Sequence, residues 1–259
     1  MMHLTQSRSA VTQRVDVPSP LRETWLNHSP CLSYSERQAL EAVAVPAKRV
    51  QPHTDLLREG KRADHLFVIT EGWACRYVMS RDGCRQLSAL LLPGDIVNLD
   101  ALSLTWQAYG VRMLTQASVV ALPREQVLML SAQHSGIAQT LLRTSLIENG
   151  TLSKWALCLG RLSAKERLAH LICELAVRIR AVDGKSVSFD FPLTQETLAD
   201  ALGLTPVHVN RMVRELRAEG LVEDAHRTIT LPDVAALRRM ASFDASYLHV
   251  NVHTSRVSN

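Results

Sequence analysis

The sequence predicts an α+β protein. An N-terminal antiparallel β-roll, of the cupin or jelly-roll kind, is followed by a long helix and a C-terminal winged helix-turn-helix. Three observations lead to this prediction. From Ala47 to about Leu122, short β-prone runs alternate with turn signals, which is the spacing of an antiparallel roll or small barrel. A helical period then extends from about Ser135 to Leu159. Finally, residues 193–221 have the pattern of two short helices joined by a tight turn.

Length and composition narrow the possibilities. The 259 residues suffice for one large domain or two ordinary ones. No apolar run approaches the roughly 18–20 residues that cross a bilayer, and residues 1–15 contain no apolar core of a signal peptide. We therefore expect a cytoplasmic protein with no membrane partner. Five cysteines without a Cys-x-x-Cys motif argue against a disulfide framework or a zinc ribbon. The net charge of +4 is too small to indicate a nucleic-acid partner by itself.

The first part of the chain contains an arm, a helix and the strands of the roll. Residues 1 to about 20 are rich in Ser, Thr and Gln and contain two prolines, so we expect a mobile arm. Ser35 to Val43 is a short amphipathic helix. Turn signals separate the strands at Glu59-Gly60, Glu71-Gly72, Arg81-Asp82-Gly83 and Pro93-Gly94-Asp95.

The roll contains no recognisable catalytic constellation, and no catalytic residue is predicted. His53, Asp55 and His65 could meet a metal, but their spacing matches no usual ligand set, so we expect surface residues and no metal site. A two-residue turn at Asp82-Gly83 predicts Arg81, and not Cys75, opposite Cys84. Buried structural thiols are the expected role of three cysteines, Cys75, Cys158 and Cys173.

The helical middle of the chain begins with a short helix from Pro123 to Ser131 and continues as a long helix from about Ser135. Apolar and large side chains recur there at mixed steps of three and four residues: Ile137, Leu141, Glu148, Leu152, Trp155 and Leu159. That is a broken heptad seam, and it predicts a dimerisation helix that Gly160 ends. The alternative is an internal core helix.

The next segments frame the helix-turn-helix. Ser163-Ala-Lys-Glu166 is a capping box that opens a helix with Leu168, Leu171, Ile172 and Leu175. Asp183-Gly184 makes a turn, and Val187 to Phe191 is a short strand. After the helix pair, Leu221 to Glu223 and Thr228 to Leu231 can form a hairpin around Ala225-His226-Arg227. Such a wing would lie against the DNA backbone or the minor groove.

The helix pair itself has the features of a DNA-binding helix-turn-helix. Thr194 is a plausible N-cap, and Gly203 supplies a residue that tolerates positive φ between the helices. Thr205 caps the second helix, and Pro206 occupies its first position. Its apolar face contains Val209, Met212, Val213 and Leu216, and the opposite face carries Val207, Asn210, Arg211 and Arg214. The alternative is a hairpin that only packs, but packing does not require an Asn- and Arg-rich outer face. The second helix is therefore predicted to lie in a major groove.

Taken in this order, the chain resembles the Crp/Fnr family of bacterial transcription regulators over roughly residues 30–250. The resemblance is carried mainly by GRLSAKERLAHLICEL, LTQETLADALGLTPVHVNRMVRELRAEGL and FDASYLHV. The glycines of the roll also resemble those of the family's cyclic-nucleotide-binding-like domain: Gly60, Gly72, Gly83 and Gly94. The resemblance implies a homodimer that binds an inverted-repeat promoter site and changes transcription when its N-terminal domain receives a signal. Its implied partners are double-stranded DNA, a second copy and RNA polymerase.

This resemblance also implies a division of the chain into five parts. They are a mobile arm (1–30), a cyclic-nucleotide-binding-like sensor roll (31–134), a dimerisation helix (135–160), a winged helix-turn-helix domain (161–250) and a tail (251–259). A regulator of this kind is not an enzyme. The alternative function is a small-molecule sensor that acts mainly through protein contacts and shows no salt-dependent DNA binding.

The sensor part departs from family members that bind cyclic AMP. Those members carry a Gly-Glu-Leu segment after a Gly-Asp turn, and later an Arg-Ser pair for the cyclic phosphate. Here the first segment reads Gly94-Asp-Ile-Val-Asn98-Leu-Asp100, and the second reads Ala108-Tyr-Gly-Val-Arg112. The ribose-binding Glu is absent, and Arg112 is out of register. Since a phosphodiester needs a charge-assisted clamp, we expect no cyclic-nucleotide cofactor.

An iron–sulfur cofactor is not expected either. Oxygen-sensing members of the family hold a cluster with an N-terminal group of cysteines, whereas here Cys31 stands alone before the roll. No cofactor is therefore predicted. A redox role for Cys31, Cys75 or Cys84 stays open.

The DNA reader departs from the family as well. Family members commonly have an Arg or Ser with a Glu early in the recognition helix, and an Arg four residues after that Glu. The later Arg is present as Arg211, while the earlier pair reads Pro206-Val207. Arg211 is therefore expected to bind guanine bidentately, and Val207 to touch a thymine methyl. Asn210 can reach a base or a phosphate. We expect His208 and Arg214 to hold phosphates, which completes a predicted DNA-binding set of Thr205, Pro206, Val207, His208, Asn210, Arg211 and Arg214.

Overall fold

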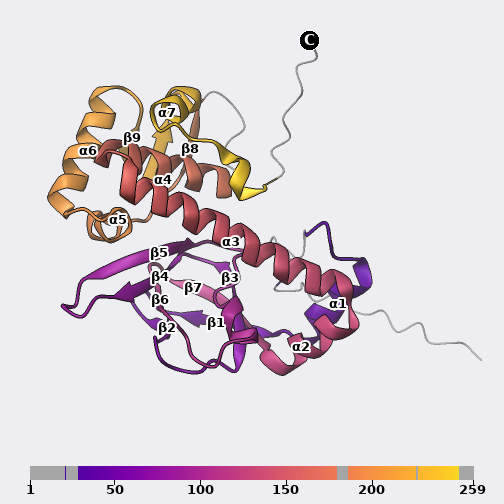
Figure 1. Cartoon of the computed structure of the whole chain (residues 1–259). Helices are drawn as coiled ribbons and strands as arrows, with labels where there is room; N and C mark the ends of the chain where they lie inside the picture. Colours follow the sequence, from indigo (N-terminus) through magenta and orange to yellow (C-terminus); the bar gives the residue numbers. More distant parts are fainter. Residues whose placement is uncertain (1–20, 22–28, 180–185, 226, 251–259) are drawn as a thin grey trace, which may run out of the picture.

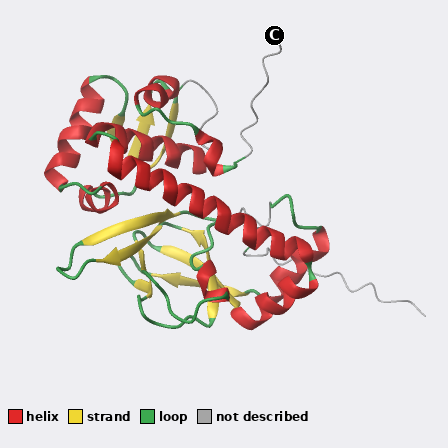
Figure 2. Cartoon of the chain, viewed as in Figure 1, coloured by secondary structure: helices red, strands yellow, loops and turns green. Residues whose placement is uncertain are grey.

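The computed structural model describes Leu21 and residues 29–179, 186–225 and 227–250 (Figure 1). The predicted mobile arm, apart from Leu21 and residues 29–30, lies outside these residues. So do the predicted turn at Asp183-Gly184 and the tail 251–259. Within the described chain, a β-roll is followed by a long helix that runs along it (Figures 1 and 2). The long helix leads into a mixed α/β domain from Ala164 to Leu248, which contains the winged helix-turn-helix and is called the reader domain, or reader, below. The predicted α+β fold class is confirmed.

The roll consists of two antiparallel sheets. One sheet contains, in spatial order, β1 (Val45–Val50), β7 (Ala117–Pro123) and β3 (His65–Glu71). The other contains β2 (Asp55–Leu57), β6 (Gly110–Met113), β4 (Ala74–Met79) and β5 (Arg85–Leu91). A short 3-10 helix, η1 (Leu99–Leu102), lies between β5 and β6.

Alternation along the strands divides the apolar side chains of the roll among separate cores. Ile69, Val111 and Met113 are buried between the two sheets. Leu66 and Val68 point to the other side of their sheet, where they pack with Val127, Leu141 and neighbours from the helices. On the second sheet, Cys75, Leu87 and Leu90 belong to the core that continues into the reader. One apolar core therefore joins the second sheet to the reader domain.

The β4–β5 hairpin has a different register from the one that the sequence predicts. Cys84 lies opposite Ser80, not opposite Arg81: the Ser80 amide donates to the Cys84 carbonyl oxygen at 2.8 Å. The loop contains three residues, because the Gly83 amide closes a turn onto the Ser80 carbonyl oxygen and Gly83 adopts φ +83°. Cys75 pairs with Leu90, so the expectation that Cys75 does not face Cys84 is confirmed.

Three helices surround one side of the roll: α1 (Tyr34–Val43), α2 (Arg124–Gln133) and α3 (Ser135–Arg161). A capping box between Ser33 and Glu36 starts α1. The prediction that Gly160 ends the long helix is wrong, since α3 continues to Arg161. It stops there because Leu162 is extended (φ −90°, ψ 149°) and leads into the cap of the next helix.

The predicted seam on α3 is mostly an internal surface. Ile137 and Trp155 are buried within the same chain, and Glu148 pairs with Arg76 of the roll. Of the six predicted seam residues, Leu152 is largely exposed, at 51 %. A different face of α3 presents Leu142 (61 % exposed), Leu146 (63 %) and Leu157 (49 %). The physical reason is that the stripe through Trp155 packs against the roll and the reader, which the helical period alone does not reveal.

The reader domain follows the expected order of elements. It contains α4 (Ala164–Arg178), β8 (Val187–Asp190), α5 (Gln195–Leu202), α6 (Pro206–Ala218), β9 (Glu223–Ala225), β10 (Thr228–Leu231), α7 (Val234–Met240) and η2 (Ala245–Leu248). The Ser163–Glu166 capping box of α4 is present as predicted. The hairpin of the wing is displaced: Glu223–Ala225, and not Leu221–Glu223, pairs with Thr228–Thr230. Val222 is instead buried in the apolar core, and β8 pairs with the other edge of β10.

Candidate nucleic-acid interface

The two helices of the reader are held by local contacts that the sequence predicted. The Thr194 side chain accepts a hydrogen bond from the Thr197 amide (3.1 Å) and caps α5. Gly203 ends α5 at φ +62°, ψ +42°, the left-handed conformation that glycine adopts without strain. The Thr205 hydroxyl accepts from the His208 amide (3.3 Å) and caps α6. The turn between the helices is therefore determined by these caps and one glycine.

The inner face of α6 is anchored in the reader core. Val209 and Leu216 are fully buried and Met212 is 5 % exposed. They belong to one apolar core with Leu198 and Leu202 of α5 and residues of α4. Burial of such side chains contributes roughly 1.5–3 kcal/mol each. This side of α6 therefore cannot face a ligand, and its burial in the core makes the opposite side of the helix point to solvent.

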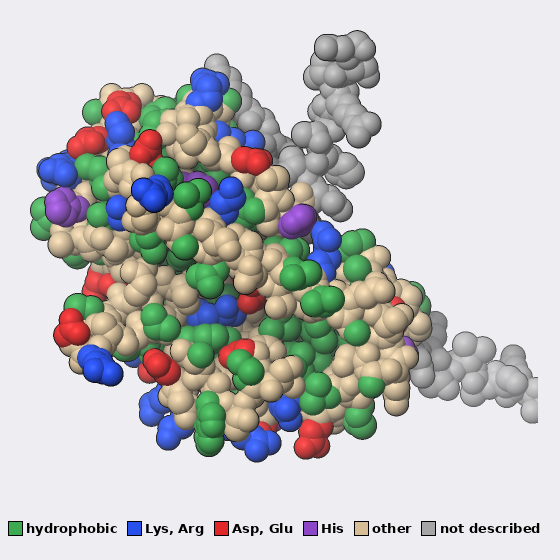
Figure 3. All heavy atoms as spheres, viewed as in Figure 1, with side chains coloured by type: hydrophobic (Ala, Val, Ile, Leu, Met, Phe, Trp, Pro, Cys, Tyr) green, Lys and Arg blue, Asp and Glu red, His purple; other side chains and the backbone are tan. Residues whose placement is uncertain are grey.

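The outer face of α6 brings the seven predicted DNA-binding residues together. Six of them are exposed, namely Thr205, Pro206, Val207, His208, Arg211 and Arg214, while Asn210 is half-buried. Val207 is 79 % exposed, the largest exposed fraction among the exposed large hydrophobic side chains of the described chain. The Arg211 guanidinium lies 3.8 Å from a Glu215 carboxylate oxygen, and its side chain is 64 % exposed. In the space-filling view, Lys, Arg and His side chains lie along the edge of the molecule where Figure 1 shows α6 (Figure 3).

The wing adds contacts that sequence reasoning missed. Arg217, near the end of α6, forms an ion pair with Asp224 of β9 at 3.0 Å. Arg227 lies in the hairpin loop between β9 and β10 with φ +71°, and its carbonyl oxygen accepts a hydrogen bond from the Phe191 amide at 2.6 Å. The Arg217–Asp224 pair joins α6 to the wing, so the two elements present a common surface. The signal that could have indicated it is the acidic start of the wing, opposite the basic end of α6.

The polar groups of the roll are occupied by contacts within the chain. Arg112 forms two hydrogen bonds with Asp55, at 2.7 and 3.1 Å, and the Tyr77 hydroxyl donates to the same carboxylate at 3.3 Å. The hydrogen bonds from Arg112, which have the largest effect, and the bond from Tyr77 hold the pKa of Asp55 below its ordinary value. The other two residues that could have met a metal with Asp55 are His53, which is exposed, and His65, which is half-buried. Among the described residues, no group of three or more His, Cys, Asp or Glu side chains is arranged to hold a metal ion.

The polar positions that match the family's nucleotide-binding segments do not fit a cyclic nucleotide. Asn98 is fully buried, where its side chain accepts from the Phe67 amide and donates to the His65 carbonyl oxygen, both at 3.0 Å. Asp95 accepts from the Leu92 amide at 2.7 Å. Since Arg112 is neutralised by Asp55, no unpaired cation is left at these positions for a phosphate.

The cysteines are scattered rather than clustered. Cys75, Cys158 and Cys173 are buried, as expected, whereas Cys84 is exposed and Cys31 is half-buried. Burial raises the pKa of Cys75 and of Cys158 to about 11, and that of Cys173 to about 12. Because the thiolate is the reactive and metal-binding form, these three side chains are poor metal ligands and nucleophiles.

Comparisons with known proteins agree with this architecture. Residues 47–134 match the model of the cyclic nucleotide-binding domain, and residues 166–240 match that of the Crp-like helix-turn-helix domain. The chain is 31 % identical to the transcriptional activator protein FnrL of Cereibacter sphaeroides over 192 residues, 72 % of this chain and 76 % of FnrL. It is 26 % identical to the anaerobic regulatory protein of Pasteurella multocida over 206 residues, 80 % of this chain and 76 % of that protein.

Solved structures share the fold. FixK2 from Bradyrhizobium japonicum superimposes with a TM-score of 0.71 at 24 % identity, covering 78 % of this chain and 100 % of that one.

None of the described helices combines the length and the apolar character needed to cross a membrane.

Proposed function

Since the chain belongs to the Crp/Fnr family of DNA-binding transcription regulators, we propose that two copies bind an inverted-repeat operator, each with α6 in a major groove. The observation that carries this proposal is the two-sided character of α6. Its inner face is buried through Val209, Met212 and Leu216, and its outer face offers Val207, Arg211 and neighbours to a partner. Two such readers fit half-sites about one helical turn apart.

The residues on the outer face of α6 have different proposed roles in DNA binding. Arg211 reads a guanine through its O6 and N7 atoms, and Val207 contacts a thymine methyl. Asn210 contacts a base or a phosphate, and His208 and Arg214 hold phosphates. Thr205 and Pro206 fix the start of the helix at the groove. The exposed Arg211–Glu215 pair, at 3.8 Å, is worth little, so the guanidinium is free to turn toward a base.

The test is the sequence preference of an Arg211→Ala variant. Binding is measured against an operator library in which each base pair is changed in turn, beginning with the region upstream of the chain's own gene. The variant should lose discrimination at one base pair of each half-site, a change of roughly 1–3 kcal/mol. Arg62→Ala on the roll, where the arginine is 60 % exposed, is the matched control and should leave the preference unchanged. The base-reading role of Arg211 is wrong if the variant binds every sequence as well as the parent does.

The same proposal requires a dimer, and we assign its interface to the exposed face of α3. Leu142, Leu146 and Leu157 recur there at steps that keep them on one side of the helix, and each is at least 49 % exposed. Hydrophobic side chains are visible at the surface along α3 in Figure 3. Packing this face against that of a second copy would bury the leucines and bring the two readers together.

The input to the regulator is proposed to be neither a cyclic nucleotide held by an Arg-Ser clamp nor an iron–sulfur cluster. The first part of this proposal is supported by the Arg112–Asp55 pair and by the internal contacts of Asn98. The second is supported by the positions of the five cysteines, since Cys31 alone precedes the roll. RNA polymerase is proposed as the further partner, because the relative FnrL is named a transcriptional activator. A run-off transcription assay with and without the protein tests this contact.

A further inference from the structure

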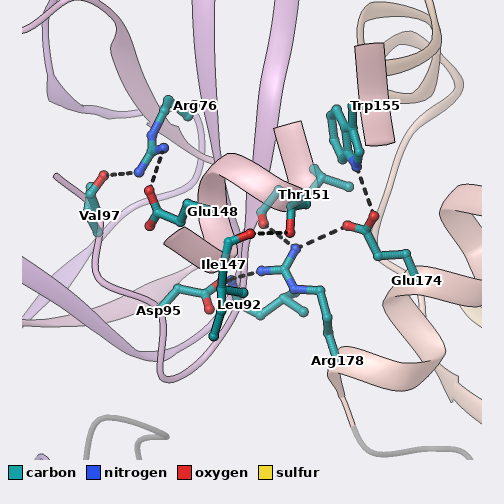
Figure 4. A network of polar contacts seen from close by, with 11 residues as sticks. Arg76, Leu92, Asp95, Val97, Ile147, Glu148, Thr151, Trp155, Glu174 and Arg178 are labelled. Carbon is teal, nitrogen blue, oxygen red and sulfur yellow. Dashed lines mark hydrogen bonds and ion pairs between the residues drawn. The ribbon is translucent and has the colours of Figure 1, made fainter. Parts of the chain in front are cut away.

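Two arginines and three carboxylates meet where the roll, α3 and the reader come together (Figure 4). Arg76 and Asp95 belong to the roll, Glu148 to α3, and Glu174 and Arg178 to α4. Arg76, Glu148 and Arg178 come from parts of the chain that are far apart in the sequence, and none of the five residues belongs to α6. Their contacts show how the reader is attached to the rest of the chain.

Arg178 joins the last turn of α4 to the roll. One of its terminal nitrogens donates to the Leu90 carbonyl oxygen at 2.9 Å, and the other pairs with an Asp95 carboxylate oxygen at 2.5 Å. The same Asp95 oxygen accepts from the Leu92 amide, which holds the carboxylate in place. Only 16 % of the Arg178 side chain and 22 % of the Asp95 side chain are exposed. A guanidinium held by a carbonyl and a carboxylate at once has a determined direction as well as a determined position.

Glu174 and Glu148 connect this contact between α4 and the roll to α3. Glu174 is fully buried, and its carboxylate accepts from the Trp155 indole nitrogen at 3.0 Å and from the Tyr247 hydroxyl at 2.7 Å. Its other oxygen lies 3.6 Å from Arg178. Glu148 pairs with Arg76 at 3.2 Å, and Arg76 also donates to the Val97 carbonyl oxygen at 2.8 Å. The cluster therefore links three parts of the chain through charge-assisted bonds.

This cluster restrains the reader domain because α4 connects that domain to α3 and to the roll. α4 starts at its Ser163 cap directly after α3, and it packs against α6 and α7 of the reader. Its first turn is thus attached to α3 through the chain, and its last turn to the roll through Arg178. A helix attached at both ends cannot swing about the bend at Leu162. A second contact, between Arg85 of β5 and Asp200 of α5 at 2.6 Å, opposes rotation about α4.

We propose that Arg178, acting through Asp95, is a positioning residue that sets the orientation of the reader on the roll and hence the half-site spacing that the dimer accepts. This inference rests on the proposed function as a dimeric DNA reader. One added base pair between half-sites turns them by about 34–36° relative to each other, because a helical turn contains about 10–10.5 base pairs. A reader that is fixed to the roll cannot follow that rotation, whereas a released reader can.

The test uses the full chain and a set of operators whose half-sites are moved apart or together by one base pair. The variants are Arg178→Gln and the double variant Arg178→Gln with Asp95→Asn, which removes both charges of the Arg178–Asp95 pair. Arg62→Gln, whose ion pair with Asp64 is exposed and lies within the roll, is the matched control. For the parent and the control, one spacing should be preferred by roughly tenfold or more, the effect of about 1.4 kcal/mol. For the double variant, the preference should shrink to roughly threefold or less, while affinity for a single half-site stays unchanged.

A second measurement does not depend on DNA. Spin labels at Glu59 of the roll and Ala235 of α7, both exposed, report the distance between roll and reader in a Cys31→Ser, Cys84→Ser background diluted with unlabelled protein. The distance distribution should be narrow in the parent and broad in the double variant. A folded double variant that keeps both the narrow distribution and the parent's spacing preference would overturn the proposal. A parent that binds no DNA, together with a distribution that broadens as described, would reject the proposed function and leave the positioning role of Arg178 supported.

Discussion

His170 should make the protein lose stability in mild acid. Its side chain is 6 % exposed in the core of the reader and packs edge-on against Phe243. The Tyr247 hydroxyl donates to Glu174, so its oxygen accepts from Nε2 of His170 at 3.2 Å. Burial, followed by the positive charge of Lys154, lowers the pKa of His170 from 6.5 to about 4. The imidazole is therefore neutral in the folded protein at neutral pH.

The sign and size of the effect follow from this lowered pKa. Well above pH 6.5 the imidazole is neutral in both states, so it does not make the free energy of unfolding depend on pH. Between pH 6.5 and about 4 the unfolded chain binds a proton that the folded protein does not. The free energy of unfolding then falls by about 1.4 kcal/mol per pH unit. The loss amounts to about 3 kcal/mol in total by pH 4.

Urea denaturation from pH 7.5 to pH 4, in the parent and in His170→Gln, measures this effect. Carboxylates titrate in both proteins, so the difference between their stability curves isolates the imidazole. The advantage of the parent over the variant should shrink by about 3 kcal/mol as the pH falls through this range. Phe243→Leu, which disturbs the same core without a titrating group, should instead keep a constant difference from the parent. Parallel curves for the parent and His170→Gln would refute the reasoning.

The other predictions concern the dimer, the input, a helix cap and a turn. Leu146→Glu should convert the proposed dimer to monomers in analytical ultracentrifugation, whereas Leu104→Glu, an exposed leucine of the roll, should not. Cyclic AMP should leave the DNA affinity unchanged in a binding titration because Arg112 already carries an ion pair; tighter binding would contradict this. Thr205→Ala should lower stability by about 1 kcal/mol in thermal melting by removing the cap of α6, and Thr205→Ser should retain it. Gly83→Ala should cost about 1–2 kcal/mol through its φ of +83° alone, since no atom lies within 4 Å of the added Cβ, and Gly83→Asn should cost less.

The most local features of the fold could be predicted from the sequence. The capping box of α4, the caps at Thr194 and Thr205 and the left-handed Gly203 all lie where their residue types indicate. The reason is that a cap or a turn involves groups within three or four residues of each other. The outer face of α6, with Arg211 and its neighbours, follows from the same short-range regularity, because a helical period determines which side chains share a face.

Features that depend on distant partners could not be predicted in the same way. Ser80 lies opposite Cys84 because the hairpin loop has three residues, a choice that the Asp82-Gly83 signal leaves open. The stripe through Trp155 faces inward because it meets the roll and the reader, although its period equally suits a dimer seam. Glu148 was part of that stripe, yet its partner Arg76 is 72 residues away.

By itself, then, the sequence determined the kind of protein: a β-roll, a long helix and a winged helix-turn-helix whose α6 presents Arg211 on an exposed face. Periodicity, caps and glycines suffice for this because they act over a few residues. Only the tertiary structure decided which face of α3 is free, and that Arg178 and Asp95 attach the reader to the roll. A buried charge is stable only beside a partner that the whole fold brings within hydrogen-bonding distance, and no local pattern specifies that partner.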